Sequence, residues 1–93
     1  MPQNRLSTRQ MEILQFLAIV TAADEGDVAY AVTVQPWEII NVPDQEIPPA
    51  QWIVRRELQF LESRGLVKFD GILWRLTPQG RIALNTWAVN GEE

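Results

Sequence analysis

The stretch from residue 50 to residue 84 constrains the fold most, because apolar patterns alternate there with residues that end helices and form turns. Apolar residues at three- and four-residue spacing predict a helix over residues 50–64. Gly65 is suited to end this helix, because glycine adopts the left-handed conformation without strain. The residues expected to face the core from this helix are Ile53, Val54, Leu58 and Leu61.

A β-hairpin is expected directly after this helix. Residues 66–69 and 72–76 are rich in apolar and β-branched side chains and predict two short strands. Asp70 and Gly71 between them predict a two-residue turn of the type that requires positive φ.

A last helix follows the predicted hairpin. Thr77 is suited to the N-cap position and Pro78 to the first helical position, where its missing N–H leaves no hydrogen bond unmade. The residues of this helix expected to face inward are Ile82, Ala83, Leu84 and Trp87.

The first third of the chain predicts a helix and a short strand. Apolar periodicity indicates a helix over residues 8–23, with Ser7 as N-cap and Leu6 as a hydrophobic staple. Gly26, in an acidic cluster, is expected to end that helix. Residues 28–34 alternate in the manner of a strand, although their alanines leave a helical extension open.

A short helix beginning at Pro36 and a proline-rich loop over residues 41–49 complete the expected order. Two helices joined by this loop and followed by a hairpin have the order of a helix-turn-helix with a β-wing. We therefore predict an α+β, mostly α, winged helix-turn-helix. Its order is helix-strand-helix-helix-strand-strand-helix, with a minimal two-residue wing turn.

Ninety-three residues correspond to one domain, for which we expect a core over about residues 7–89 and flexible ends at 1–5 and 90–93. The absence of cysteine and histidine excludes disulfides, thiolate or imidazole metal sites and nucleophiles that depend on either residue. No apolar run is long enough to span a membrane, and residues 1–7 show no signal-peptide pattern. We expect a cytoplasmic protein without enzymatic activity, cofactor or metal.

Charge is distributed unevenly along the chain, although the net charge is −4. Residues 1–46 hold two basic and seven acidic residues, whereas residues 47–90 hold six basic and three acidic ones. Such asymmetry is typical of chains with a charged partner, and it also arises by chance in small domains. The segment with the positive balance is the one predicted to form the second helix of the motif and the wing.

Residues 58–67 (LQFLESRGLV) and 74–81 (WRLTPQGR) resemble the winged helix-turn-helix superfamily, most closely the multiple-antibiotic-resistance (MarR) and phenolic-acid (PadR) repressor types. Those types show Leu-x-x-Leu-x-x-x-Gly-Leu-Val, then a wing, then Leu-Thr-x-x-Gly. The resemblance implies a transcriptional regulator that binds double-stranded DNA. The acidic Asp70 at the wing tip departs from the basic tip that probes a DNA groove.

The helix over residues 50–64 is expected to be the recognition helix, because arginine and glutamine read guanine and adenine edges in the major groove. Arg64, Lys68 and Arg75 are expected to contact phosphates. In the other interpretation Arg55 and Arg56 lie on a solvated face, with Arg55 paired to Gln59. The candidate DNA-binding residues are Gln51, Trp52, Arg55, Arg56, Gln59, Arg64, Lys68 and Arg75.

The four tryptophans fall into two groups. Trp37, Trp74 and Trp87 lie within apolar patterns and are expected in the core. Trp52 lies on the exposed side of its helix, where it either stacks on a nucleotide or a partner protein, or packs against residues 42–49.

Two functions therefore follow from the sequence. The first is a small winged-helix DNA-binding regulator of prokaryotic or phage type. The alternative is an acidic winged-helix protein-interaction module that binds a protein partner or a second copy of itself and not DNA.

Overall fold

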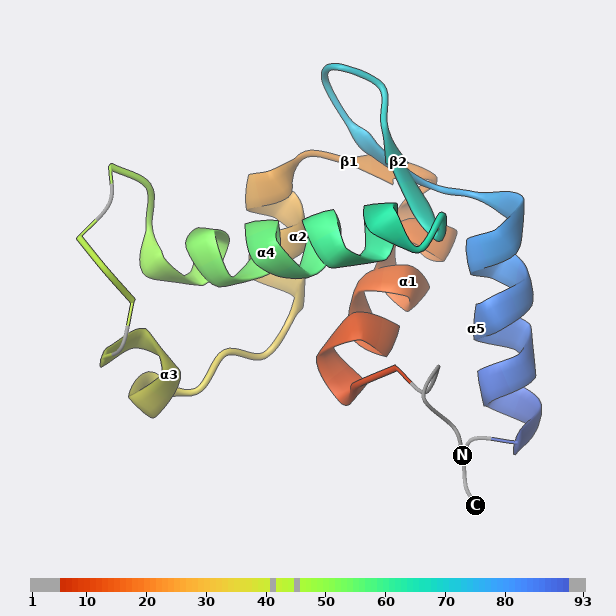
Figure 1. The fold of residues 1–93 in the computed structure, drawn as a ribbon, viewed down its shortest axis with the longest axis horizontal. Coiled ribbons are helices and arrows are strands. Elements are labelled where there is room, and N and C mark those ends of the chain that lie inside the picture. The colour runs from red at the N-terminus through yellow and green to blue at the C-terminus, as the bar shows by residue number, and fades with distance from the viewer. Residues whose placement is uncertain (1–5, 41, 45, 91–93) are drawn as a thin grey trace.

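The computed structural model describes residues 6–40, 42–44 and 46–90, and it is mostly helical with one small antiparallel sheet (Figure 1). This architecture is compatible with the predicted α+β class. Residues 1–5 and 91–93, predicted to be flexible, and the side chain of Trp87, predicted to be buried, lie outside the described part. The elements in chain order are α1 (Thr8–Val20), β1 (Ala22–Ala23), α2 (Glu25–Ala31), α3 (Pro36–Ile40), α4 (Pro49–Ser63), β2 (Val67–Phe69), β3 (Trp74–Leu76) and α5 (Pro78–Asn90).

The second half of the chain follows the sequence prediction closely. Helix α4 occupies residues 49–63, and Gly65 after it has φ +77, the left-handed conformation expected of it. The Thr77 hydroxyl accepts a hydrogen bond from the Gly80 N–H at 3.0 Å, as a helix N-cap does, and donates one to the Gly65 carbonyl at 2.6 Å. Local signals suffice here because each stop or cap acts on its own neighbours.

The hairpin turn is wider than predicted. Phe69 pairs with Trp74, so four residues connect the strands where a two-residue turn was expected. The Asp70 N–H donates to the Leu73 carbonyl at 3.0 Å. One Asp70 carboxylate oxygen accepts the N–H groups of Ile72 at 2.9 Å and of Leu73 at 2.8 Å. The side chain of Asp70 thus fixes a longer loop that the Asp-Gly signal alone does not reveal.

The predicted end of the first helix is wrong. Helix α1 begins at Thr8 with the expected Ser7 cap, but it ends at Val20 and not at residue 23. Thr21 has φ +74, and the next two residues form β1, which pairs with β3. Pairing with a strand about fifty residues later overrides the helical periodicity, and a sequence pattern carries no trace of it.

The predicted strand over residues 28–34 is also wrong, because residues 25–31 form α2. Asp24 caps this helix by accepting the Asp27 N–H at 2.7 Å. Acidic side chains in the first turn favour the helix through its dipole. Gly26 lies inside α2 and does not end α1. The helical alternative that the alanines left open is the correct one, as a separate helix.

The helix that packs on α4 is α2, and not the short helix at Pro36 expected in that role. Helix α3 lies in the segment that connects α2 to α4, at the lower left of Figure 1. Arg9 of α1 anchors this segment by hydrogen bonds to Glu38 at 2.6 Å and to the Thr33 carbonyl. Trp37, expected in the core, is 66% exposed.

The core lies where α1, α2, α4 and the sheet meet. Trp74 is 7% exposed, as predicted, whereas Ile82, predicted to face inward, is 63% exposed. Ala83 and Leu84 pack against the core as partly buried residues. Its buried residues are Met11, Ile13, Leu14, Leu17, Ala23, Val28, Val32, Val54, Leu58, Leu61, Leu66, Val67 and Trp74.

Candidate nucleic-acid interface

Helix α4 presents one apolar and one polar side. Val54, Leu58 and Leu61 are fully buried and hold the helix on the core, as their spacing predicted. Ile53, predicted to face the core with them, is half-buried. Pro49 begins the helix without a side-chain cap, since proline fits the first helical turn. The remaining side of α4 is therefore displayed by a well-anchored helix.

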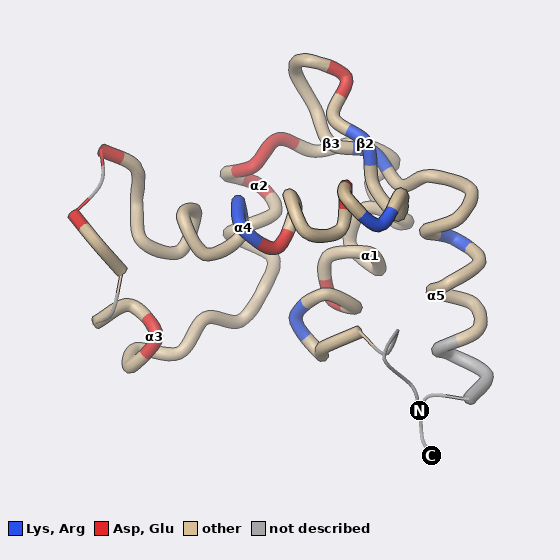
Figure 2. Tube along the Cα trace, viewed as in Figure 1, with Lys and Arg blue, Asp and Glu red and all other residues tan. Residues whose placement is uncertain are grey.

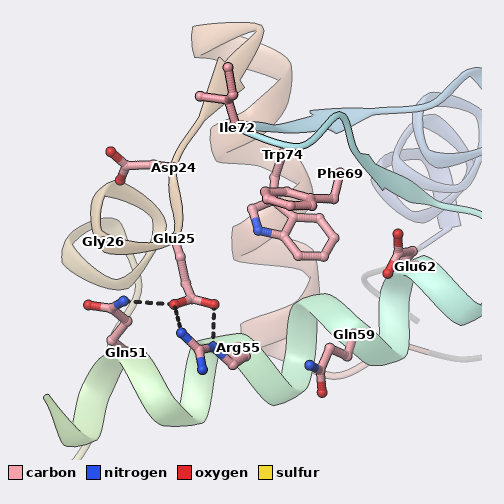
Figure 3. A pocket seen from close by; sticks show the side chains of 10 residues that line it. All are labelled: Asp24, Glu25, Gly26, Gln51, Arg55, Gln59, Glu62, Phe69, Ile72 and Trp74. Atoms are coloured by element: carbon pink, nitrogen blue, oxygen red, sulfur yellow. Dashed lines mark hydrogen bonds and ion pairs between the residues drawn. The ribbon is translucent and has the colours of Figure 1, made fainter. Parts of the chain in front are cut away.

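Arg55 is held by a carboxylate from α2 (Figure 3). Its Nε donates to Glu25 Oε2 at 2.7 Å, and its Nη2 donates to Glu25 Oε1 at 2.8 Å. Gln51 Nε2 donates to the same Oε1 at 2.7 Å. The hydrogen bonds from Arg55 lower the pKa of Glu25 more than burial raises it, and Glu25 in turn raises the pKa of Arg55.

The predicted alternative partner of Arg55, Gln59, is therefore not the one found. Glu25 takes that place from the first turn of α2, which packs beside α4. The sequence pattern does not reveal Glu25 as this partner, because the acidic cluster around Gly26 predicts a loop that ends α1. The position of Glu25 as the first residue after the Asp24 cap was the signal that could have placed it on a helix.

The outward side of α4 carries Trp52 and Arg56. The Arg56 guanidinium lies 5.1 Å from the centre of the Trp52 ring, a cation–π arrangement. Trp52 is half-buried, and Arg56 and Gln59 are exposed. Glu57, the acid beside Arg56 in the sequence, accepts a hydrogen bond from Gln10 of α1 at 2.9 Å and so points toward α1.

At the end of α4, Arg64 lies over the Phe60 ring, with its guanidinium carbon 5.5 Å from the ring centre. Its side chain is therefore already engaged by a neighbour on the same helix.

The two basic residues of the hairpin lie opposite each other on neighbouring strands. Lys68 on β2 pairs in register with Arg75 on β3, so both side chains project from one face of the sheet. Arg75 Nε donates to Asp70 Oδ2 at 2.9 Å. Two backbone N–H groups and Arg75 lower the pKa of Asp70 from its ordinary 3.8 to about 2.

A groove of about 720 Å³ separates the polar edge of α4 from the hairpin (Figure 3). Its apolar side includes Phe69 and Trp74, whose rings lie 5.0 Å apart on the sheet face opposite to Lys68 and Arg75. The structure therefore does not bring all predicted site residues onto one face. The groove is lined by Asp24, Glu25, Gly26, Gln51, Arg55, Gln59, Glu62, Phe69, Ile72 and Trp74.

Charges of both signs meet at this site. Figure 2 shows basic positions on the middle of α4 and at the base of the hairpin, with acidic positions at the start of α2 and the hairpin tip. Arg55 and Arg75 are paired with acids, whereas among the described residues Arg56 and Lys68 have no ion pair. Glu25 of the acidic first half thus neutralises Arg55, and Asp70 of the second half neutralises Arg75.

The chain shares its fold with a DNA-binding protein. BpsR from Bordetella bronchiseptica, whose DNA binding is regulated by 6-hydroxynicotinic acid, superposes with a TM-score of 0.70 over 99% of this chain at 24% sequence identity. The chain spans 59% of the length of BpsR. No protein-family model and no curated protein matches the sequence.

The described residues form neither a metal-binding group of acidic side chains nor a membrane-spanning helix. Among them, no three acidic side chains gather in a way that holds a metal ion. None of the helices they form has the length and apolar character to cross a membrane.

Proposed function

We propose that this chain is the DNA-binding module of a winged-helix transcriptional regulator of the MarR and PadR kind, acting in the cytoplasm of a bacterium or on behalf of a phage. The observation that carries the proposal is the pairing of α2 with α4, which leaves the polar side of α4 exposed. The shared fold with BpsR over nearly the whole chain supports it.

Helix α4 enters the major groove in this proposal, because an α-helix fits there and its arginine and glutamine side chains match base edges. Arg55 and Gln59 face bases, and Arg56 contacts a phosphate beside them. Trp52 positions Arg56, since the guanidinium stacks on the Trp52 ring in a cation–π contact. Lys68, on the other face of the hairpin, contacts the phosphates of the flanking DNA.

The test is a binding titration with a fluorescent duplex pool of random sequence, read by anisotropy. The double variant Arg55→Ala with Arg56→Ala should abolish binding. Arg81→Ala is the matched control, because it removes an exposed positive charge from α5 and leaves α4 and the hairpin intact. Equal binding by the wild type and the double variant would refute the proposal.

A protein-interaction module is the second candidate, and one observation favours it. Tyr30 at 96%, Trp37 at 66% and Ile40 at 79% exposure lie on α2 and α3, and large apolar side chains in such numbers are typical of protein contacts. This candidate predicts no retention on heparin and self-association that Trp37→Ala weakens. Sedimentation velocity at increasing concentration measures the latter.

A further inference from the structure

We infer that Glu25 is a specificity-determining residue: it fixes one edge of the Arg55 guanidinium so that the other edge is presented to guanine. This inference rests on the proposed DNA-binding function. It assigns to α2 a part in base recognition although α2 itself touches no base.

The hydrogen bonds divide the guanidinium into two edges. Arginine has five N–H donors, and Glu25 uses the one on Nε and one of the two on Nη2. One Nη1 donor and the second Nη2 donor form the adjacent, terminal edge. Figure 3 shows the third guanidinium nitrogen directed away from Glu25. That free edge has the paired-donor geometry that matches guanine O6 and N7.

Burial places the acid inside and the cation outside. The Glu25 side chain is 16% exposed, whereas that of Arg55 is 44% exposed. Both Glu25 oxygens are already occupied, one of them by Arg55 and Gln51 together. Glu25 is therefore poorly placed to accept from a base itself, and well placed to hold a side chain that reads one.

The support behind Glu25 is rigid. It occupies the first turn of α2, which Asp24 caps by a 2.7 Å hydrogen bond, and Gln51 fixes its carboxylate from the side of α4. A free arginine loses much rotamer freedom on binding, and this loss is smaller when the side chain is already held. Preorganisation thus strengthens the contact with the correct base.

The charge of Glu25 has a second effect in the same direction. Attraction to phosphates acts on any DNA sequence and depends on uncompensated positive charge. Glu25 neutralises Arg55 and so reduces its share of that general attraction, while the directional contact to guanine is retained. Glu25 therefore lowers the sequence-independent affinity for DNA and raises the discrimination between guanine and the other bases.

The test compares selection from a random duplex library by the wild type and by the variants Glu25→Gln, Arg55→Ala and Asp27→Asn. The wild type should enrich a motif with a guanine preferred about tenfold, the scale of a bidentate arginine contact. Both Glu25→Gln and Arg55→Ala should lose that preference. Glu25→Gln should bind the unselected library as well as or better than the wild type, which also shows that it is folded.

Asp27→Asn is the matched control, since it removes the same charge from the same turn of α2 without a side-chain bond to α4, and it should keep the guanine preference. A guanine preference unchanged in Glu25→Gln, or a wild-type motif that Arg55→Ala leaves intact, would overturn the inference alone. A wild type that binds no duplex would overturn the proposed function with it.

Discussion

Gly80, in the first turn of α5, lies close against the backbone of Leu66, the residue before β2. A Cβ added there would lie 2.1 Å from the Leu66 carbonyl oxygen and 2.7 Å from a methyl carbon of Leu76. The first neighbour is backbone, and its carbonyl also accepts the Thr77 N–H at 3.1 Å, so it cannot move without loss of that hydrogen bond. Helix α5 must therefore shift away from Leu66 by roughly 1.3 Å, the gap to a normal contact.

Gly80→Ala should consequently destabilise the protein, although alanine is the better helix former. Overpacking costs about 1–3 kcal/mol, and helix propensity returns at most about 1 kcal/mol. We expect a net loss of about 1–2 kcal/mol, which lowers the melting temperature by roughly 4–16 °C in a chain of this size. Thermal unfolding followed by far-UV circular dichroism measures it.

Gly26→Ala is the matched control, because the same change should have the opposite sign. The added Cβ would meet only Asp24 Oδ1 at 3.5 Å and Gln51 Oε1 at 3.9 Å, which are ordinary contacts. Alanine reduces the conformational entropy of the unfolded chain, so this variant should be more stable than the wild type by about 0.5–1 kcal/mol. A Gly80→Ala protein as stable as the wild type, or a shift of both variants in one direction, would refute the described packing of α5.

Two further predictions concern the hairpin and its closing helix. The lowered pKa of Asp70 means that its stabilising contacts are complete above about pH 4 and are lost as the pH falls toward 2. The NMR chemical shifts of the hairpin amides should therefore change between these pH values in the wild type. Asp70→Asn, which has no carboxylate to protonate, is the control. Wild-type shifts that stay as constant as those of Asp70→Asn would contradict this. Thr77→Ala should lower the free energy of unfolding in urea by about 0.5–2 kcal/mol. It removes the hydroxyl that accepts the Gly80 N–H and donates to the Gly65 carbonyl. Thr77→Ser keeps the hydroxyl and should lose much less, and equal losses would argue against the cap.

The parts of the fold that sequence reasoning predicted correctly are those set by neighbouring residues. Ser7, Gly65 and Thr77 each act within a few positions, and each has the capping or left-handed geometry expected of it. Strand β1 escaped prediction because two alanines carry no strand pattern and depend on pairing with β3. Helix α2 escaped because its residues Val28 and Tyr30 begin an alternating pattern over residues 28–34 that fits a strand equally well.

The candidate site shows the same division. The buried stripe of α4 and its exposed arginines follow from helical periodicity alone. The partner of Arg55 does not, since Glu25 lies 30 residues earlier and reaches it only through the packing of α2 on α4. The charge imbalance between the two halves of the sequence predicts a basic site in the second half. It gave no sign that an acid from the first half would lie within the site.

The salt dependence of DNA binding tests most directly whether α4 contacts DNA. Among the described residues, Arg56 and Lys68 are exposed cations of the site that no ion pair neutralises. Two phosphate contacts predict that affinity for a random duplex falls about tenfold between 50 and 200 mM salt, with a log–log slope of about −2. Arg56→Ala should reduce this loss to roughly three- to fourfold, as one contact predicts. Binding that is independent of salt, or a slope that Arg56→Ala leaves unchanged, would contradict a DNA interface on α4.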